Sequence, residues 1–324
     1  MDEYLKFLSG KTVFVTGGTG SFGKIMVSVL AKTGVRKIIV FSRDEEKQSS
    51  MRFEFSDPRI KFIIGDVRDY GRLLESIPRE TDLLYHAAAL KQVPFCEEHP
   101  YEAFSTNVIG AHNVKRAALE KRVRLCIAIS TDKAVKPVNV MGMTKALQER
   151  IFSRASVEHK ETGFVCVRYG NVIGSRGSVV PLFKNLLAAN KPLRVTHPEM
   201  TRFWLTLPEA VSLIFTASKY ARSGEILVKK LPACFVVDLA RTMMALNNTE
   251  TTIEFTGVRP GEKIHETLVS EEEMVRTRDS DGVFVIQPKA CNGSNLAGVE
   301  YRSDTARRML PEEIKKMLSD GGWS

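Results

Sequence analysis

Cysteine is scarce and unpaired in this chain of 324 residues. The five cysteines lie far apart, their number is odd, and no two form a CxxC pair. This pattern excludes a disulfide framework and a cysteine-rich metal site, and it is typical of reduced thiols in the cytoplasm. The six histidines show neither HExxH nor HxH spacing, so we expect no metal ion.

Long apolar runs are also missing. No stretch approaches the roughly 18 apolar residues that a membrane-spanning helix requires. The acidic start, Met1-Asp2-Glu3-Tyr4, lacks the apolar segment of a signal peptide. We therefore expect a cytoplasmic protein that does not insert into membranes.

Acidic residues are outnumbered, because 47 Lys and Arg stand against 38 Asp and Glu, a net charge of +9. The basic residues are scattered and few alternate with aromatics, which favours a phosphorylated small molecule over nucleic acid. The hydrophobic share of 43% is ordinary for a globular protein. A chain of this length is typical of two domains and needs no disulfides to hold a core.

Short apolar runs alternate with helix-like stretches in the first half. Nearly unbroken β-branched runs are typical of buried parallel strands. The expected strands are 12–16, 37–41, 60–64, 83–86, 125–129 and 164–168. Repeated βαβ units predict an α/β fold with a Rossmann-like, doubly wound parallel sheet.

The second half is less regular. Helical patches at 181–189, 208–220, 236–246 and 311–318 alternate with short strands. We expect a Rossmann domain over residues 1–170 and a smaller C-terminal α/β lobe that binds substrate over residues 171–324, with the two parts interleaved.

A glycine loop follows the first expected strand and opens a helix. Its GxxGxxG spacing allows a tight turn and a close approach of the backbone to a pyrophosphate, and the helix N-terminus adds a positive dipole end. Strand, loop and helix stand in the order that dinucleotide binding requires. The candidate residues are Gly17, Thr19, Gly20, Ser21, Phe22 and Gly23.

The end of the second strand decides which dinucleotide is expected. An acidic residue there would bind the ribose of NAD, but the chain has Ser42 and Arg43. Arg43 can fork onto a 2′-phosphate, which favours NADP over NAD; the alternative is an ordinary surface arginine. Asp66 and Val67, after the third strand, are candidates for the adenine, or Asp66 caps the next helix.

Further segments resemble the extended short-chain dehydrogenase/reductase family, and within it the C5-inverting UDP-N-acetylglucosamine 4,6-dehydratases. The resemblance covers roughly residues 8–320 and lies in separated motifs. These are Ala87-Ala88-Ala89, Leu90–Pro94, Asn107, Ser130–Val135, Asn139–Lys145, Arg168–Val172, Gly174–Pro181, Met200–Trp204 and Arg259–Lys263.

The resemblance implies a lyase of surface polysaccharide or glycan synthesis. Hydride leaves C4 of the sugar for NADP, water is eliminated across C5 and C6, and the hydride returns to C6. The resemblance assigns Asp132 as the acid for the C6 oxygen and Lys133 as the base for C5, with Thr131 in the same motif. As a base Lys133 must be partly neutral, so we expect desolvation or a nearby cation to lower its pKa.

At one position the chain departs from the pattern of the superfamily in a way that affects catalysis. Most of this superfamily has Tyr-x-x-x-Lys on the next helix, and here Lys145 is present but Met141 occupies the tyrosine position. A thioether cannot take a proton, so the C4 hydroxyl proton goes to Lys133, or else to Asp132 or a water. Alternatively, Met141 fills the core of a protein that has lost catalysis.

The resemblance also implies where ligands and subunits bind. Ala87, Ala88, Ala89, Asn107 and Lys145 would contact the cofactor. The substrate UDP-N-acetylglucosamine would contact Lys91, Asn171, Arg176, Val180, Lys184, Arg202, Arg259 and Glu262. Related enzymes are homo-oligomers, and helices 103–121 and 143–160 are candidates for packing between subunits. The alternatives are a UDP-sugar 4-epimerase and a non-catalytic NADP-binding protein.

Overall fold

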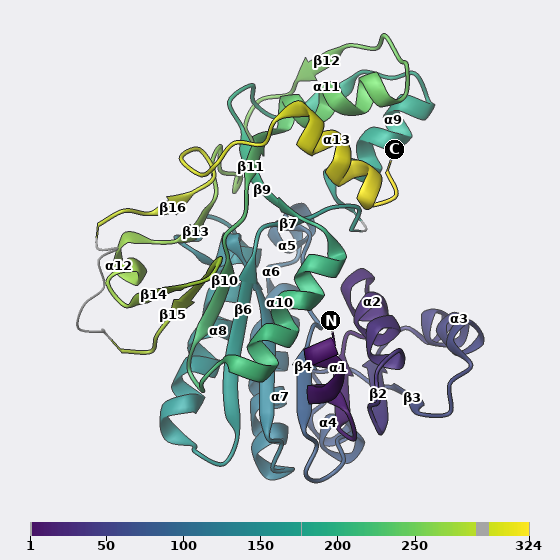
Figure 1. The fold of residues 1–324 in the computed structure, drawn as a ribbon, viewed down its shortest axis with the longest axis vertical. Coiled ribbons are helices and arrows are strands. Elements are labelled where there is room, and N and C mark those ends of the chain that lie inside the picture. The colour runs from purple at the N-terminus through teal and green to yellow at the C-terminus, as the bar shows by residue number, and fades with distance from the viewer. Residues whose placement is uncertain (1, 176, 290–297, 324) are drawn as a thin grey trace.

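The computed structural model describes residues 2–175, 177–289 and 298–323. Its centre is a nine-stranded sheet, parallel from β3 to β10 with two antiparallel strands at the far edge (Figure 1). In sheet order the strands are β14 (Thr277–Ser280), β15 (Val283–Ile286), β10 (Ile226–Lys229), β6 (Gly163–Tyr169), β5 (Leu125–Thr131), β4 (Leu83–His86), β1 (Thr12–Thr16), β2 (Lys37–Ser42) and β3 (Ile60–Ile64).

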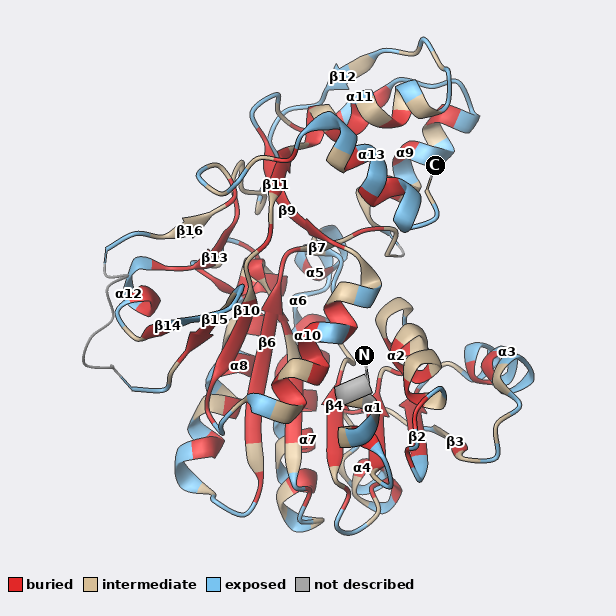
Figure 2. Ribbon diagram, viewed as in Figure 1, coloured by how far each residue is buried: buried red, intermediate tan, exposed pale blue. Residues whose placement is uncertain are grey.

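The sheet is buried on both faces, which explains its apolar strands. Every residue of β1 and β4 is buried, and Val13 pairs with Ile38 on one side and Leu83 on the other. Figure 2 shows the central strands as a buried layer inside more exposed helices. The predicted Rossmann-like fold is confirmed.

Helices cover the sheet on both sides. Helices α1 (Asp2–Leu8), α2 (Ser21–Ala31) and α10 (Leu207–Tyr220) pack in contact on one face. Helices α4 (Tyr70–Ser76), α7 (Gly110–Glu120) and α8 (Val140–Glu158) form the layer on the other. Helix α3 (Glu45–Phe55) lies beside β3 at the edge.

The helix expected over residues 103–121 is divided. It begins as α6 (Pro100–Phe104), widens into a π-helical turn (η1, Ser105–Ile109), and continues as α7. The wide turn holds Asn107, whose buried amide bonds both the N–H and the carbonyl of Leu90. Asn107 therefore anchors the loop that runs from β4 to α5 (Val93–Glu98).

A second group of elements lies beyond the carboxyl ends of the central strands (Figure 1). It has its own apolar core around Phe183 and Trp204. Its strands are β7 (Asn171–Val172), β8 (Leu193–Val195), β9 (Thr201–Leu205), β11 (Ala233–Phe235) and β12 (Ile253–Phe255), and its helices are α9 (Val179–Ala188), α11 (Val236–Leu246) and α13 (Pro311–Asp320).

The chain crosses between the two groups several times. After residue 171, α10, β10, β14 and β15 return to the large sheet. A short sheet of β13 (Thr267–Val269) and β16 (Tyr301–Arg302), with α12 (Glu271–Met274), packs beside it.

Within the described residues, no helix has the length and apolarity needed to cross a membrane. The four described cysteines, Cys96, Cys126, Cys166 and Cys234, are buried free thiols, and Cys291 lies outside the described residues.

Candidate active site

The glycine loop packs directly against the end of β4. Gly17 has a φ of +65°, and a Cβ there would lie 2.7 Å from the Ala88 nitrogen. A Cβ on Gly23 would lie 2.5 Å from the Gly17 carbonyl oxygen. Only glycine fits at these two positions, because each lies where two backbone segments nearly touch.

This loop borders a cavity of about 300 Å³, the nucleotide cavity. Gly20 is the N-cap of α2 and no side chain caps it, so the positive end of the helix can receive a phosphate. These features fit the diphosphate of a dinucleotide. The cavity is lined by Gly17, Thr19, Gly20, Ser21, Phe41, Ser42, Arg43, Asp44, Lys47, Gly65, Asp66, Val67, Ala87, Ala88, Ala89, Lys91 and Thr106.

Arg43 lies at the rim of the nucleotide cavity with its side chain half exposed. Its Nη1 is 3.4 Å from Asp66 Oδ2, and Arg68 binds the same carboxylate at 2.7 Å. Burial acts to raise the pKa of Asp66, but Arg68 and Arg43 outweigh burial and lower it. Asp66 therefore anchors Arg43 at the cavity as a carboxylate.

Four residues predicted for the cofactor lie outside the cavity lining. Phe22 packs against the main core and Gly23 underlies the loop. Asn107 anchors the Leu90 loop, as described above. Lys145 is buried in α8, where Nζ donates to Gln148 Oε1 at 2.7 Å, and burial lowers its pKa to about 8.

The expected acid–base pair lies at the carboxyl end of β5. The strand runs to Thr131, two residues further than predicted, and a 3₁₀ turn of Asp132–Ala134 follows. Asp132 is fully buried, and its Oδ1 accepts from Thr131 Oγ1 at 2.8 Å and from Lys133 Nζ at 3.1 Å. The structure thus holds an amine and a carboxylate together at the end where open α/β sheets bind ligands.

A second carboxylate, Glu266, contacts Lys133. Its Oε1 lies 3.1 Å from Lys133 Nζ. Burial acts to lower the pKa of Lys133, but the charges of Asp132 and Glu266 outweigh it and the pKa is raised. The expectation of a partly neutral Lys133 is therefore wrong for this arrangement, because two carboxylates hold the amine as an ammonium.

Met141 is buried in an apolar cluster with Cys96 and Ala103. Its side chain packs within this cluster, and its thioether has no proton to exchange. The tyrosine position of α8 therefore contributes no acid or base in this chain.

A second cavity of about 460 Å³, the lobe cavity, lies in the C-terminal elements. Four residues predicted for the substrate line it: Asn171, Arg202, Arg259 and Glu262. Its lining also includes residues that were not predicted as substrate contacts; some lie inside the motifs at 174–181 and 200–204, and the others lie outside every motif. These are Gly177, Ser178, Val179, Pro181, Leu182, Asn185, Arg194, Val195, Thr196, Met200, Trp204 and Val236.

Other substrate candidates lie elsewhere. Val180 is wholly buried in the core of the C-terminal elements, so its side chain does not line the lobe cavity. Lys184 Nζ lies over the Trp323 ring, 5.5 Å from its centre. Lys91 lines the nucleotide cavity instead. Arg176 lies outside the described residues.

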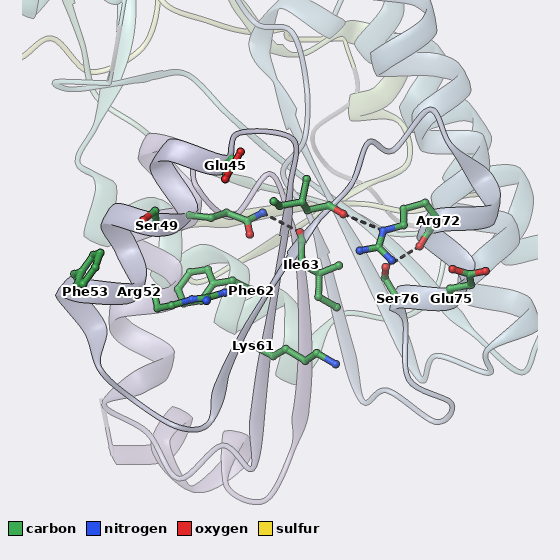
Figure 3. Close-up of a pocket in the computed structure, with 12 residues that line it drawn as sticks. Glu45, Ser49, Arg52, Phe53, Lys61, Phe62, Ile63, Arg72, Glu75 and Ser76 are labelled. Carbon is green, nitrogen blue, oxygen red and sulfur yellow. Dashed lines mark hydrogen bonds between the residues drawn. The ribbon is translucent and has the colours of Figure 1, made fainter.

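A larger cavity of about 620 Å³ lies away from this chemistry, between α3 and α4 over the edge strand β3 (Figure 3). Its polar groups are largely engaged: Gln48 Nε2 donates to the Ile63 carbonyl and Arg72 Nε to the Ile64 carbonyl. It contains no acid–base pair of the kind found at β5. Among the described residues, no cluster of His, Cys, Asp or Glu is placed to hold a metal ion.

Known proteins resemble the chain over nearly its whole length. A UDP-glucose 4-epimerase of Rickettsia bellii is 42% identical over 326 aligned residues, 95% of each chain. The X-ray structure of Pen from Bacillus thuringiensis gives a TM-score of 0.91 at 35% identity, covering 98% of this chain and 99% of that one.

The fold extends to more distant proteins. DesIV, a dTDP-glucose 4,6-dehydratase of Streptomyces venezuelae with NAD and TYD bound, gives a TM-score of 0.73 at 18% identity over 96% of each chain. At this identity the likeness shows the fold alone. A family match covers residues 13–288. With that match and a relative 42% identical over 95% of its length, the chain belongs to the polysaccharide biosynthesis protein family.

Proposed function

We propose that this protein is a nucleotide-sugar 4,6-dehydratase that converts UDP-N-acetylglucosamine to a UDP-2-acetamido-2,6-dideoxy-hexos-4-ulose with inversion at C5. The observation that carries the proposal is the pair Asp132 and Lys133, joined at 3.1 Å at the end of β5. The nucleotide cavity opens at the neighbouring strands β4 and β1. Arg202 lines the lobe cavity and faces Glu266, which in turn contacts Lys133.

Elimination of water needs one group to take the C5 proton and another to protonate the departing C6 hydroxyl. Asp132 and Lys133 supply a carboxyl and an amine for these two steps. A bound nicotinamide would supply the hydride acceptor at C4. Lys133, whose side chain is 20% exposed, is open to a ligand, whereas Asp132 is shielded from solvent.

Lys133 starts this cycle protonated, because its two carboxylate neighbours favour the ammonium. It must release that proton before it can act as a base. Since Met141 cannot take the C4 hydroxyl proton, Lys133 remains the first candidate for that step, with Asp132 or a water as the second.

The lobe cavity suits the UDP part of the substrate. Arg259 and Arg202 bring planar guanidinium groups, which bind diphosphates well. Asn171 and Glu262 add an amide and a carboxylate for the ribose and the base.

NADP is the proposed cofactor because of Arg43. Its guanidinium is half exposed at the rim of the nucleotide cavity and is held only at 3.4 Å by Asp66. A 2′-phosphate would give it a stronger, charge-assisted partner.

We also propose a homo-oligomer. The π-helical turn contacts α8, as does α6, and each of the three exposes large apolar side chains. We call Tyr101, Phe104, Ile109, Met143 and Leu147 the α6–α8 apolar face.

A UDP-sugar 4-epimerase is the second candidate, favoured by the name of the 42% identical relative. An epimerase returns hydride to C4 and eliminates nothing, so it has no use for an acid–base pair aimed at C5 and C6.

Mass spectrometry separates the two functions. Purified protein, NADP and UDP-N-acetylglucosamine should give a product lighter by one water, and Asp132→Asn should not. In deuterated water, NMR should show deuterium at C5 and the inverted configuration. A new isomer of unchanged mass would support the epimerase, and bound NADP without any product would support a non-catalytic protein.

A further inference from the structure

Glu266 is a buried charged residue outside every motif used so far. It lies just before β13, its side chain is 2% exposed, and its backbone N–H donates to Ser303 Oγ at 2.9 Å. One carboxylate oxygen, Oε1, contacts Lys133 Nζ at 3.1 Å and faces Arg202 Nε at 3.8 Å. The other, Oε2, is buried and has no hydrogen-bond partner.

The charged groups around Glu266 come from three separate segments. Lys133 and Asp132 follow β5, Arg202 lies on β9, and Lys263 precedes Glu266 in its own loop. Lys263 Nζ is held by the Val135 carbonyl at 2.7 Å, and Arg202 is held by the carbonyls of Ile264 and Lys263. Lys133 is thus the cation that Glu266 contacts most closely, at 3.1 Å against 3.8 Å for Arg202.

We propose that Glu266 is a positioning residue for Lys133, and that its carboxylate takes up the Lys133 proton when Lys133 acts as a base. This inference rests on the proposed function, because that function supplies the step in which Lys133 removes a substrate proton. The geometry itself, an ammonium held at 3.1 Å by two carboxylates, does not depend on it.

The proton transfer balances within the pair. The Lys133 ammonium gives one proton to the Glu266 carboxylate, which leaves a neutral amine and a carboxylic acid. The amine then takes one proton from the substrate and becomes an ammonium again. It passes that proton to Asp132, 3.1 Å away, which delivers it to the departing C6 hydroxyl, and the Glu266 acid then returns its own proton to the free amine. No oxidant or further reactant is needed.

The position of Glu266 also links Lys133 to the loop that lines the lobe cavity. The loop that carries Arg259 and Glu262 into the lobe cavity ends at Glu266, beside Lys133. Asn139, the N-cap of α8, bonds the Gly261 carbonyl of the same loop at 2.7 Å. The loop is therefore fixed to the sheet at several points, which holds the Glu266 carboxylate in place.

Competitive labelling tests the pairing without any need for activity. Trace acetic anhydride, applied over a pH series and read by mass spectrometry of the Lys133 peptide, gives the midpoint of Lys133 deprotonation. We expect Glu266→Gln to lower that midpoint by about 1 to 3 pH units, because an opposite charge has been removed. His265→Gln is the matched control: it lies in the same loop but bonds Thr201 instead, so the midpoint should not move.

Steady-state kinetics test the catalytic consequence. For Glu266→Gln we expect kcat to fall by about 100-fold, the low end of an acid–base contribution. The KM for UDP-N-acetylglucosamine should stay within about threefold, because Glu266 does not line the lobe cavity. Glu266→Asp keeps the charge but lengthens the contact, so its midpoint and kcat should both be intermediate; this variant carries the test if Glu266→Gln does not fold.

An unchanged Lys133 midpoint in both variants would overturn the inference, and so would a normal kcat in Glu266→Gln. A shifted midpoint in a protein whose wild type dehydrates no UDP-sugar would support the pairing and overturn the proposed function instead.

Discussion

Two lysines of the site show how surroundings decide the charge of one residue type. Lys145 is buried beside the neutral amide of Gln148, and burial lowers its pKa to about 8. Burial also acts to lower the pKa of Lys133, yet the charges of Asp132 and Glu266 outweigh it and raise that pKa. An amine in a motif therefore does not reveal its protonation until its neighbours in space are known.

The sequence predicted part of this site, for physical reasons. Asp132 and Lys133 were predicted because the motif Ser130–Val135 resembles that of the dehydratases, and their place after a buried strand agrees with where ligands bind in such sheets. Glu266 was not among the predicted site residues, because its contact with Lys133 arises only when the loop before β13 folds back onto the 3₁₀ turn after β5. No local pattern records a contact of that kind.

Arg43 should control the choice of cofactor. We expect Arg43→Ala to weaken NADP binding by about 10- to 100-fold, the loss of one charge-assisted contact, and to leave NAD binding nearly unchanged. Fluorescence titration with both cofactors measures this. Arg52→Ala, on the far side of α3 over the Phe62 ring, should change neither affinity. Equal losses for NADP and NAD would remove Arg43 as the discriminator.

His86 should make the protein sensitive to mild acid. It is wholly buried, and burial and the Lys145 charge lower its pKa to about 3. The unfolded chain takes up a proton below about pH 6.5 that the folded chain refuses, so stability falls as the pH drops. For this one group the loss is about 2 kcal/mol between pH 7 and pH 5.

Urea unfolding at the two pH values measures the loss. His86→Phe should reduce the difference by about 2 kcal/mol, since phenylalanine cannot titrate and the ring already stacks on Phe152. If His86→Phe lost as much stability between pH 7 and pH 5 as the wild type does, His86 would not be the group responsible for the acid sensitivity.

At the scale of elements, strands were easier to predict than helix detail. Near-continuous apolar runs such as 37–41 matched β2, because a strand covered on both faces must be apolar. The π-helical turn at Ser105–Ile109 could not be predicted, since it depends on the bonds that Asn107 makes to Leu90. Helix α8 also approaches the 3₁₀ turn after β5 closely at Gly142, where a Cβ would collide with the Lys133 carbonyl.

The α6–α8 apolar face should hold subunits together. We expect the double variant Met143→Glu and Leu147→Glu to lower the mass measured by light scattering, because charges would be buried without partners. Phe53→Glu, an equally drastic change at the exposed end of α3, should leave the mass unchanged. A double variant of unchanged mass would show that the subunits meet elsewhere.

At the scale of the whole molecule, one buried arginine joins three parts of the chain. Arg168 of β6 binds Glu149 of α8 at 2.6 Å, Glu273 of α12 at 2.8 Å and the Leu268 carbonyl at 2.8 Å. Burial acts to raise the pKa of Glu273, but the charge of Arg168 outweighs burial and lowers it. The segment that carries β13 and α12 is therefore fastened to the large sheet through a charged cluster inside the protein.

Removing Arg168 should destabilise the folded protein strongly. We expect Arg168→Met to lower the free energy of unfolding by about 3 to 5 kcal/mol, because two buried carboxylates lose their cation. Arg154→Met breaks an exposed pair with Glu158 and should cost no more than about 1 kcal/mol. Urea unfolding of both variants at pH 7 measures the two losses of unfolding free energy. Similar losses would mean that the buried cluster stabilises the fold no more than the exposed pair does.

The two partners of Arg168 are synthesised at different times, so the charged cluster forms in two stages during translation. Glu149 precedes Arg168 by 19 residues and can neutralise it as soon as β6 forms. Glu273 follows 105 residues later, which the ribosome takes roughly 5 to 20 s to add at about 5–20 residues per second. Until then Arg168 lacks one of its two carboxylates, and the cover that β13 and α12 give the sheet has not formed. The partly synthesised chain therefore keeps part of its sheet uncovered until the segment that contains Glu273 has been translated.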